Sequence, residues 1–195
     1  MYKVYGTAKS RAARVLWMLE ELGQPYDHVN ANSRSPEVVA VNPRGKIPVL
    51  EVDGTVITDS TAIMQFLADR HGALTFAAGT LERAQQDSLT HFLLDEFDAI
   101  LWTAARHSFV LPSDQRCPEV KESLKWEFTR SQAAMVARMG PGPFLMGEVM
   151  TVPDILLAHC LIWAAGAKFA VTEPALVDYL AQMRARPAFS RAMAR

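Results

Sequence analysis

The sequence predicts an α/β domain over residues 1–75 and an all-helical domain over residues 81–195. Strand and helix signals alternate in the first part of the chain, whereas the remainder reads almost wholly as helix. The dipeptide Asp53-Gly54 separates two strand-like runs and is a strong hairpin signal, because a mirror-image turn needs positive φ. The run Gly-Pro-Gly-Pro at residues 140–143 firmly breaks the helical part.

The composition is that of a globular chain with balanced charge. Of the 195 residues, 50% are hydrophobic and 21% are charged, which supplies enough apolar material for a substantial core. A formal net charge of -1 gives no broad attraction to nucleic acid or to an anionic membrane, so neither is expected as a partner. The longest nearly apolar run, residues 155–167, is shorter than the roughly 20 residues that span a bilayer.

The cysteines and histidines predict no metal centre. Cys117 and Cys160 are isolated, so they form neither a disulfide framework nor a zinc cluster. The five histidines are scattered, with no pair at metal-ligand spacing. The first six residues lack the apolar core of a secretory signal. Together these features predict a cytoplasmic protein.

The first domain is expected to start with a strand over residues 3–5. An apolar stripe at helical spacing follows and predicts a helix, which Gly23 ends and Pro25 prevents from resuming. The stripe consists of Ala12, Val15, Leu16, Leu19 and Leu22. A second strand is expected over residues 26–30, and Pro36 is well placed to open a short helix.

A hairpin and a helix complete this domain. The hairpin strands are expected over residues 47–52 and 55–58, where β-branched residues are frequent. Ser60 can then cap a helix that His71-Gly72 closes. The resulting order is β-α-β-α-β-β-α. A β-α-β start followed by a hairpin and a final helix is the thioredoxin-like pattern.

Five helices are expected in the second domain. They cover residues 81–107, 118–139, 152–167, 174–184 and 188–193. The sequence Thr151-Val-Pro-Asp154 resembles a capping box, with the aspartate as the reciprocal partner of the threonine. Pro153 falls in the first turn, where a helix tolerates the missing N–H. The predicted fold is therefore a thioredoxin-like domain followed by an all-α domain.

The turn between the first strand and the first helix, residues 6–11, contains no cysteine. Thioredoxin-like redox enzymes carry a Cys-x-x-Cys pair at this place, so neither dithiol exchange nor a mixed-disulfide mechanism is expected. Hydroxyl groups remain at Thr7 and Ser10, beside a helix N-terminus whose N–H groups and dipole favour an anion. Ser10 could donate a hydrogen bond to a thiolate, or it could simply cap the helix.

Ile47-Pro48 lies immediately before a predicted strand. If the peptide bond were cis, the backbone of Ile47 would turn outward and could pair with a peptide ligand as a short added strand. The alternative is an ordinary trans proline at the start of an edge strand, which is the commoner arrangement. The sequence around this bond leaves both alternatives open.

Asp59-Ser60 directly precedes a predicted helix. The carboxylate could accept from a ligand ammonium group, and the hydroxyl with the N–H groups of the helix start could bind a ligand carboxylate. These two functions match the charges of an amino-acid headgroup. The simpler alternative is that the pair only caps the helix.

In combination, these features give a chain that resembles the glutathione S-transferases over essentially its whole length. The motifs that carry the resemblance are Tyr5-Gly6, residues 14–23, residues 42–48, residues 59–63 and residues 151–156. The resemblance implies a cis proline at Pro48 and a γ-glutamyl headgroup bound by Asp59 and Ser60. It also implies that Lys46 reaches the glycyl carboxylate of glutathione.

The family stabilises the glutathione thiolate with a tyrosine, a serine or a cysteine. Tyr2 and Tyr5 precede the turn, and the turn has no cysteine. Ser10 is therefore the expected thiolate donor, with Thr7 as the alternative, and Arg11 could supply positive charge at the same place.

The resemblance implies a glutathione transferase that activates the thiolate for attack on a small hydrophobic electrophile. Glutathione would be a co-substrate, no other cofactor is expected, and the family usually forms homodimers. The electrophile pocket is expected between the domains, with Trp102, His107 and Phe109 as candidates, although aromatic residues at helical spacing more often form a core.

Two other functions remain open on this fold. One is a non-catalytic protein that binds glutathione or another protein. The other is a different glutathione-dependent enzyme, such as a peroxidase, an isomerase or a dehalogenase.

Overall fold

The computed structural model describes residues 1–195, and the chain forms two compact units. Unit 1 contains residues 1–77 and 183–195, and unit 2 contains residues 78–182. The predicted domain ranges, 1–75 and 81–195, stay predictions. Unit 2 is therefore inserted between two segments of the chain that both belong to unit 1.

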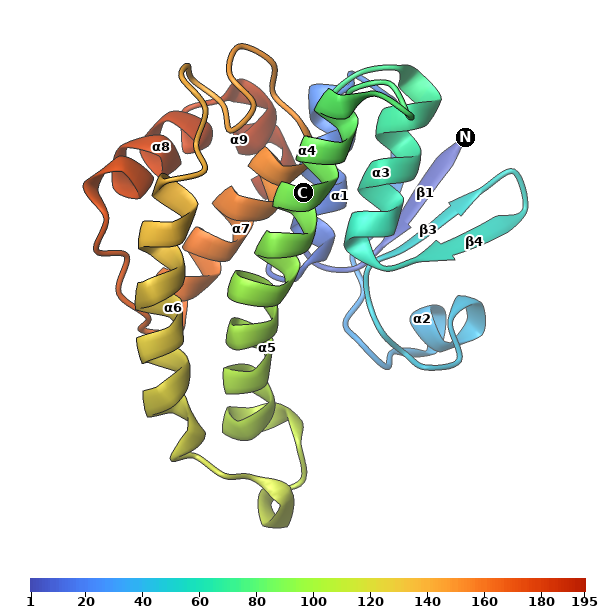
Figure 1. Ribbon diagram of the computed structural model, residues 1–195. Helices are drawn as coiled ribbons and strands as arrows, with labels where there is room; N and C mark the ends of the chain where they lie inside the picture. The colour runs from blue at the N-terminus through green and yellow to red at the C-terminus, as the bar shows by residue number, and fades with distance from the viewer. The chain divides into compact units, whose positions relative to one another are not determined.

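Unit 1 is built on a mixed sheet of four strands (Figure 1). The strands are β1 (Tyr2–Tyr5), β2 (Tyr26–Val29), β3 (Val49–Val52) and β4 (Thr55–Thr58), in the spatial order β2-β1-β3-β4. β1 runs parallel to β2, whereas β3 is antiparallel to both β1 and β4. This sheet, with the helices of the two units, confirms the predicted fold class.

The hairpin forms as the sequence predicts, but its first strand begins later than expected. Asp53 and Gly54 both have positive φ, 51° and 74°, as the mirror-image turn requires. β3 begins at Val49 and not at residue 47. Pro48 has no N–H to donate to the ladder, so regular pairing starts after it.

Four helices accompany the sheet: α1 (Ala12–Glu21), α2 (Pro36–Val41), α3 (Ser60–His71) and α9 (Pro187–Met193). α2 and α3 lie on opposite sides of the sheet (Figure 1). The main core lies between α1, α3 and the sheet. Its fully buried members include Val4, Val15, Leu16, Leu50, Ile63 and Leu67. A smaller cluster under α2 consists of Tyr5, Ala31, Val38 and Val49.

The chain returns to unit 1 through residues 183–195, where α9 packs on α1. The rings of Trp17 and Phe189 meet edge to face with centroids 4.9 Å apart. The Glu21 carboxylate accepts from both the Nε and Nη2 groups of Arg186, at 2.6 and 2.8 Å, and from the Trp17 indole N–H at 2.8 Å. A bidentate pair of this kind fixes orientation as well as distance.

Glu20 anchors the same segment one residue earlier in α1. Its carboxylate accepts from the guanidinium groups of Arg191 and Arg195 and from the hydroxyl of Tyr26. Burial beside this carboxylate raises the pKa of Tyr26 to about 12, so its hydroxyl remains a donor. Burial by itself would raise the pKa of Glu20, but the three hydrogen bonds outweigh that effect and lower it.

Unit 2 consists of helices. They are α4 (Leu81–Leu93), α5 (Ile100–Ala105), α6 (Val120–Val136), α7 (Val152–Gly166) and α8 (Pro174–Arg184), the last of which ends just beyond residue 182. The helix expected over residues 81–107 is interrupted by a π-helical segment, Leu94–Ala99, and a second one, Arg106–Val110, extends it beyond the expected end. None of the helices in the structure combines the length and the apolar character needed to cross a membrane.

α7 begins at a buried carboxylate that links three parts of unit 2. Asp154 is fully buried, and its Oδ2 accepts from the N–H and the hydroxyl of Thr151. Its Oδ1 accepts from the N–H of Leu145 and the hydroxyl of Tyr179. Burial raises the pKa of Asp154, and these donors oppose the shift by stabilising the charged form.

We predict that replacing Asp154 by Asn lowers the free energy of unfolding by at least about 3 kcal/mol, because buried donors then lose a charged acceptor. Tyr179→Phe removes a single bond from the same carboxylate and should cost about 1.5 kcal/mol. Urea denaturation of both variants measures these losses. Equal losses for the two variants would contradict a role of Asp154 as the common acceptor.

A second prediction concerns pH. Because the native pKa of Glu20 is lowered, its contribution to stability is complete above the usual pKa of about 4.5 and is lost as the pH falls through the lower native pKa. Glu20→Gln should therefore be less stable than the unaltered protein at neutral pH, and the difference should shrink in acid. Urea denaturation at several pH values tests this, with Glu82→Gln, an exposed carboxylate, as the control.

Candidate functional site

The pairing register brings three loops to one end of the sheet in unit 1. Tyr5, the last residue of β1, pairs with Val49, the first of β3, and Val49 pairs in turn with Thr58, the last of β4. The turn after β1, the loop before β3 and the start of α3 therefore emerge side by side. These are the three segments in which the sequence placed its candidate glutathione-binding residues.

The turn after β1 is tightly closed. Gly6 has φ 138°, and a Cβ on it would lie 2.6 Å from the Cβ of Ala12. The N–H of Gly6 donates to the carbonyl of Val29, which holds the end of β1 against β2. Glycine is therefore required here both by backbone conformation and by the close approach of the helix.

The side chain of Ser10 is hydrogen-bonded within this turn. Its hydroxyl donates to the carbonyl of Thr7 at 2.8 Å and accepts from the N–H of Ala12 at 3.1 Å. The Ser10 hydroxyl thus contacts the first residue of α1, whose N-cap residue is Arg11. The Thr7 hydroxyl, in contrast, has no hydrogen-bond partner within the chain. Arg11 lies next to Ser10 at the first turn of α1 and is half-buried.

The two tyrosines of β1 are engaged elsewhere. The hydroxyl of Tyr5 donates to Glu51 Oε2 at 2.8 Å, and that of Tyr2 lies 2.8 Å from Nε2 of His71. Neither hydroxyl lies in the turn after β1. This geometry does not favour a tyrosine as the thiolate donor.

The loop before β3 presents an unpaired stretch of backbone. The Ile47-Pro48 peptide bond is cis, as the resemblance implies. The N–H and C=O of Ile47 have no partner in the chain, although both neighbouring segments are hydrogen-bonded. Asn42 organises this loop, because its side chain donates to the carbonyl of Lys46 and accepts from the N–H of Arg44.

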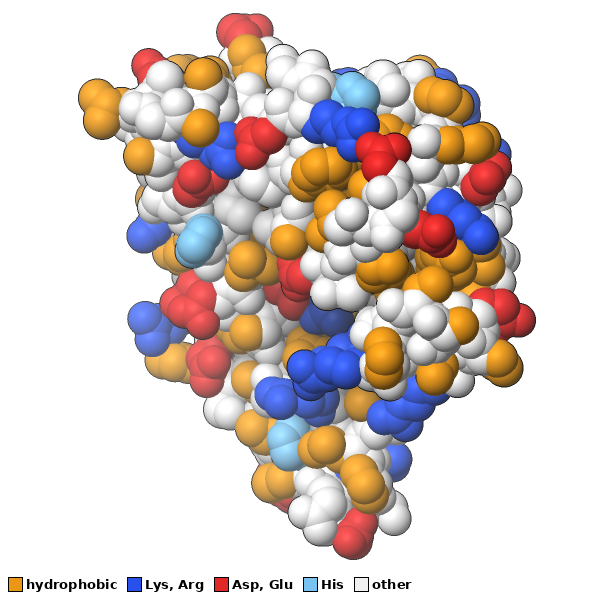
Figure 2. Space-filling view, turned by 90° about the vertical axis from the view of Figure 1, so that its right-hand side faces the viewer, with side chains coloured by type: hydrophobic (Ala, Val, Ile, Leu, Met, Phe, Trp, Pro, Cys, Tyr) orange, Lys and Arg blue, Asp and Glu red, His pale blue; other side chains and the backbone are white.

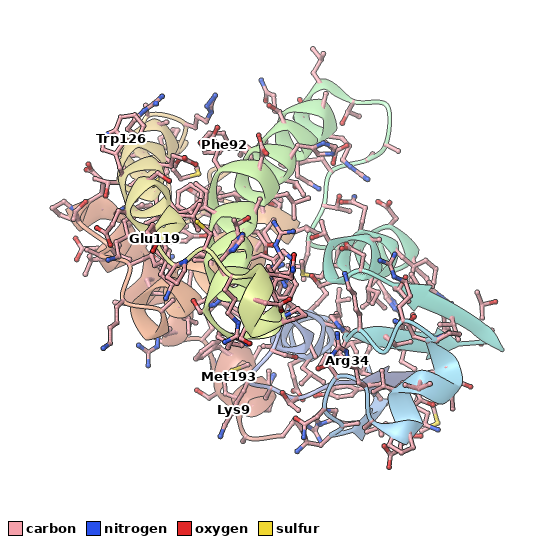
Figure 3. The ribbon with its side chains drawn as sticks, turned by 90° about the horizontal axis from the view of Figure 1, so that it is seen from below. Lys9, Arg34, Phe92, Glu119, Trp126 and Met193 are labelled. Atoms are coloured by element: carbon pink, nitrogen blue, oxygen red, sulfur yellow. The ribbon has the colours of Figure 1, made fainter.

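Cationic side chains surround this loop. Lys46, Arg44 and Arg34 are all exposed, and no acidic partner binds their side chains. Arg34 is attached directly to the loop, since its N–H donates to the carbonyl of Gly45 at 2.7 Å. Figure 3 labels Arg34 on the segment before α2 and Lys9 in the turn after β1. Figure 2 shows Lys and Arg side chains exposed on the face that it presents.

The start of α3 corrects one prediction. Asp59 and not Ser60 caps this helix: with φ 74°, Asp59 directs Oδ1 to the N–H groups of Thr61 and Ala62. Its Oδ2 has no partner in the chain. Ser60 is the first residue of α3, and its hydroxyl oxygen accepts from Nη1 of Arg14 at 3.2 Å. The N–H of Ser60 has no acceptor in the chain.

Arg14 is a residue that the motif analysis did not single out. It is 1% exposed and contacts Ser60 from α1. The available signal was a lone cation on an apolar helix, between Ala13 and Val15. Such a residue is rarely buried without a polar partner.

The three residues expected at the electrophile pocket all belong to unit 2. Trp102 is a half-buried residue of α5. His107 and Phe109 lie in the second π-helical segment, where Nδ1 of His107 accepts from the N–H of Cys117 and Phe109 is 69% exposed. Their contribution to a pocket stays a prediction.

Comparison with known proteins shows similarity to glutathione S-transferases in sequence and in fold. Residues 10–70 match the family model described as glutathione S-transferase, N-terminal domain. The chain is 27% identical over 203 residues to glutathione S-transferase 4 of Zea mays, covering 97% of this chain and 90% of the relative. The crystal structure of a glutathione transferase from Methylococcus capsulatus superposes with a TM-score of 0.83 at 25% identity, over 100% of this chain and 98% of that one.

A shorter sequence similarity connects the chain to elongation factor 1-gamma. It is 32% identical over 130 residues to elongation factor 1-gamma of Trypanosoma cruzi, which covers 63% of this chain but 29% of the factor. The class defined by fold and comparison is a thioredoxin-like domain joined to a helical domain. Within that class, residues 10–70 are similar to the N-terminal domain of the glutathione S-transferases, and the whole chain is similar to proteins that carry this name.

We predict that Gly6→Ala lowers the free energy of unfolding by about 2 kcal/mol or more, because the new Cβ meets Ala12 and the backbone conformation is unfavourable. Gly54→Ala is the matched control: φ is also positive, but nothing lies within 4 Å of the added Cβ, so the loss should be about 1 kcal/mol. Thermal or urea unfolding compares the two. Equal losses would refute the close approach at Gly6.

Proposed function

We propose that the chain is a glutathione transferase that activates the glutathione thiol for attack on a small hydrophobic electrophile. One observation carries the proposal. The sheet register places the end of β1, the unpaired backbone of Ile47 and the unpaired N–H of Ser60 at one end of unit 1. A γ-glutamyl peptide with a central thiol has complementary groups in this order.

The binding mode follows from the unused hydrogen-bonding groups. The cysteinyl backbone of glutathione would pair with the N–H and C=O of Ile47 beside Pro48, as a short added strand. The γ-glutamyl carboxylate would accept from Ser60, where the α3 dipole favours negative charge. The γ-glutamyl ammonium group would bind Oδ2 of Asp59, and Lys46 would bind the glycyl carboxylate. Glutathione is then a co-substrate, and no further cofactor is proposed.

The hydroxyl groups of the first turn would stabilise the thiolate. An unperturbed thiol with a pKa of roughly 8.5 is only about 3% ionised at neutral pH. A shift of about 2 units needs about 2.7 kcal/mol, and one hydrogen bond to a charged group supplies ~1.5–3 kcal/mol. Ser10 is the first candidate and Thr7 the second, with Arg11 adding positive charge. Turning the Ser10 proton away from the Thr7 carbonyl gives up a neutral bond of about 1 kcal/mol, which is the smaller quantity.

The second substrate would be an apolar electrophile. Trp102, His107 and Phe109 are the proposed contributors to its pocket. A cytoplasmic homodimer is the proposed form of the protein, by analogy with the family. Holding the electrophile next to the thiolate would supply the remaining rate enhancement through proximity.

A second candidate function is glutathione binding without transfer. The Ser10 hydroxyl is already hydrogen-bonded to Thr7 and Ala12. One similar protein is named elongation factor 1-gamma, and that name states no transfer reaction. Other glutathione-dependent reactions, such as peroxide reduction, isomerisation or dehalogenation, would use the same thiolate.

The test measures glutathione binding and conjugation in the same variants. We predict that Ser10→Ala lowers the conjugation rate at least roughly tenfold, while glutathione affinity from calorimetry changes less than about threefold, because the hydroxyl acts on the thiolate and not on the peptide. Ser10→Thr keeps a hydroxyl and should retain more activity. Thr7→Val is the matched variant for the alternative donor.

The outcomes separate the candidates. If Thr7→Val is the impaired variant, the thiolate donor is Thr7. If the unaltered protein binds glutathione but shows neither thiolate absorbance nor conjugation, binding without transfer is correct. If it does not bind glutathione at all, the proposed function is wrong.

A further inference from the structure

The most deeply buried charged side chain of unit 1 contacts the candidate headgroup site. Arg14 is 1% exposed and is one of the largest fully buried side chains in the chain. Removing a guanidinium from water costs several kcal/mol unless hydrogen bonds compensate. One of these bonds runs from Nη1 of Arg14 to Oγ of Ser60 at 3.2 Å. The cation therefore lies directly behind the first residue of α3.

This contact decides how the Ser60 hydroxyl is used. A serine hydroxyl has one proton to donate and two lone pairs that accept. Because its oxygen accepts from Arg14, the proton is left to donate, and it has no acceptor within the chain. Ser60 is only 3% exposed, so a missing acceptor at this depth is unusual.

The backbone N–H of Ser60, like its hydroxyl proton, has no acceptor within the chain. The N–H groups of Thr61 and Ala62 are capped by Asp59, whereas the N–H of Ser60 is left without an acceptor. The buried hydroxyl of Thr61 also has no partner. Ser60 thus offers two donors at the positive end of a 12-residue helix, with a guanidinium immediately behind them. That combination suits a carboxylate.

We propose that Arg14 is a positioning residue for the α-carboxylate of the γ-glutamyl group. It holds the Ser60 oxygen so that the hydroxyl proton joins the N–H of Ser60 in binding the carboxylate. Its charge also favours an anion there, since screening is weak at this depth. This inference rests on the proposed glutathione site. It explains why the ligand would need an α-carboxylate on its γ-glutamyl group.

A purely structural role would give a different result. If Arg14 only fills the core, replacing it weakens every ligand of the site equally, through stability or through displacement of α3. If it acts through Ser60 on the carboxylate, only ligands that carry this carboxylate lose affinity. The distinction needs two ligands that differ in that group alone.

The experiment compares glutathione with γ-aminobutyryl-cysteinyl-glycine, which lacks only the α-carboxylate. Calorimetry with Arg14→Met, which keeps an extended side chain but removes the charge, should show affinity for glutathione reduced at least roughly tenfold. Affinity for the analogue should stay within about twofold of that of the unaltered protein. Arg14→Lys should recover part of the loss. Arg186→Met, which removes another guanidinium from unit 1, should change neither affinity.

A second variant keeps the test decisive if Arg14→Met does not fold. Ser60→Ala should show the same selective loss for glutathione, and adding Arg14→Lys to it should cause no further loss. Equal losses for both ligands, or independent effects of the two substitutions, would overturn the positioning role while leaving glutathione binding intact. Failure of the unaltered protein to bind glutathione would overturn the proposed function and this inference together.

Discussion

The antiparallel pairing of β3 with both β1 and β4 is the constraint on which the candidate site depends. It aligns Tyr5, Val49 and Thr58 in one row, so that three segments far apart in the sequence leave the sheet at the same end. A shift of one residue in this register would turn the buried faces of the strands outward. The same apolar residues that build the core therefore also hold the site together.

Asp154 and Ser60 are both buried and polar, but they differ in whether their hydrogen-bonding groups have partners within the chain. Asp154 is fully buried, and both of its oxygens are filled by donors from unit 2. It needs no ligand, which is typical of a structural residue. Ser60 is buried to a similar degree, but its N–H and its hydroxyl proton lack acceptors. Since buried donors are rarely left unpaired, this contrast separates a folding element from a binding element.

The carboxylates at the end of α1 give the C-terminal segment its place. Glu20 and Glu21 are neighbours in sequence, yet they bind different arginines of residues 183–195: Glu21 binds Arg186, and Glu20 binds Arg191 and Arg195. The aromatic contact between Trp17 and Phe189 adds apolar burial to these ion pairs. α1 thus contributes to the core, contacts Ser60 through Arg14 and holds α9 in place.

The sequence alone determined the order of elements, because apolar spacing, glycine stops and the Asp53-Gly54 turn are local signals. It also indicated the segments of the site. Only the tertiary structure decided what individual side chains do: Asp59 caps α3 in place of Ser60, Ser10 bonds within its own turn, and Arg14 is buried behind Ser60. These outcomes depend on contacts across the sheet and between helices, and no local pattern specifies which of several nearby donors an oxygen will accept from.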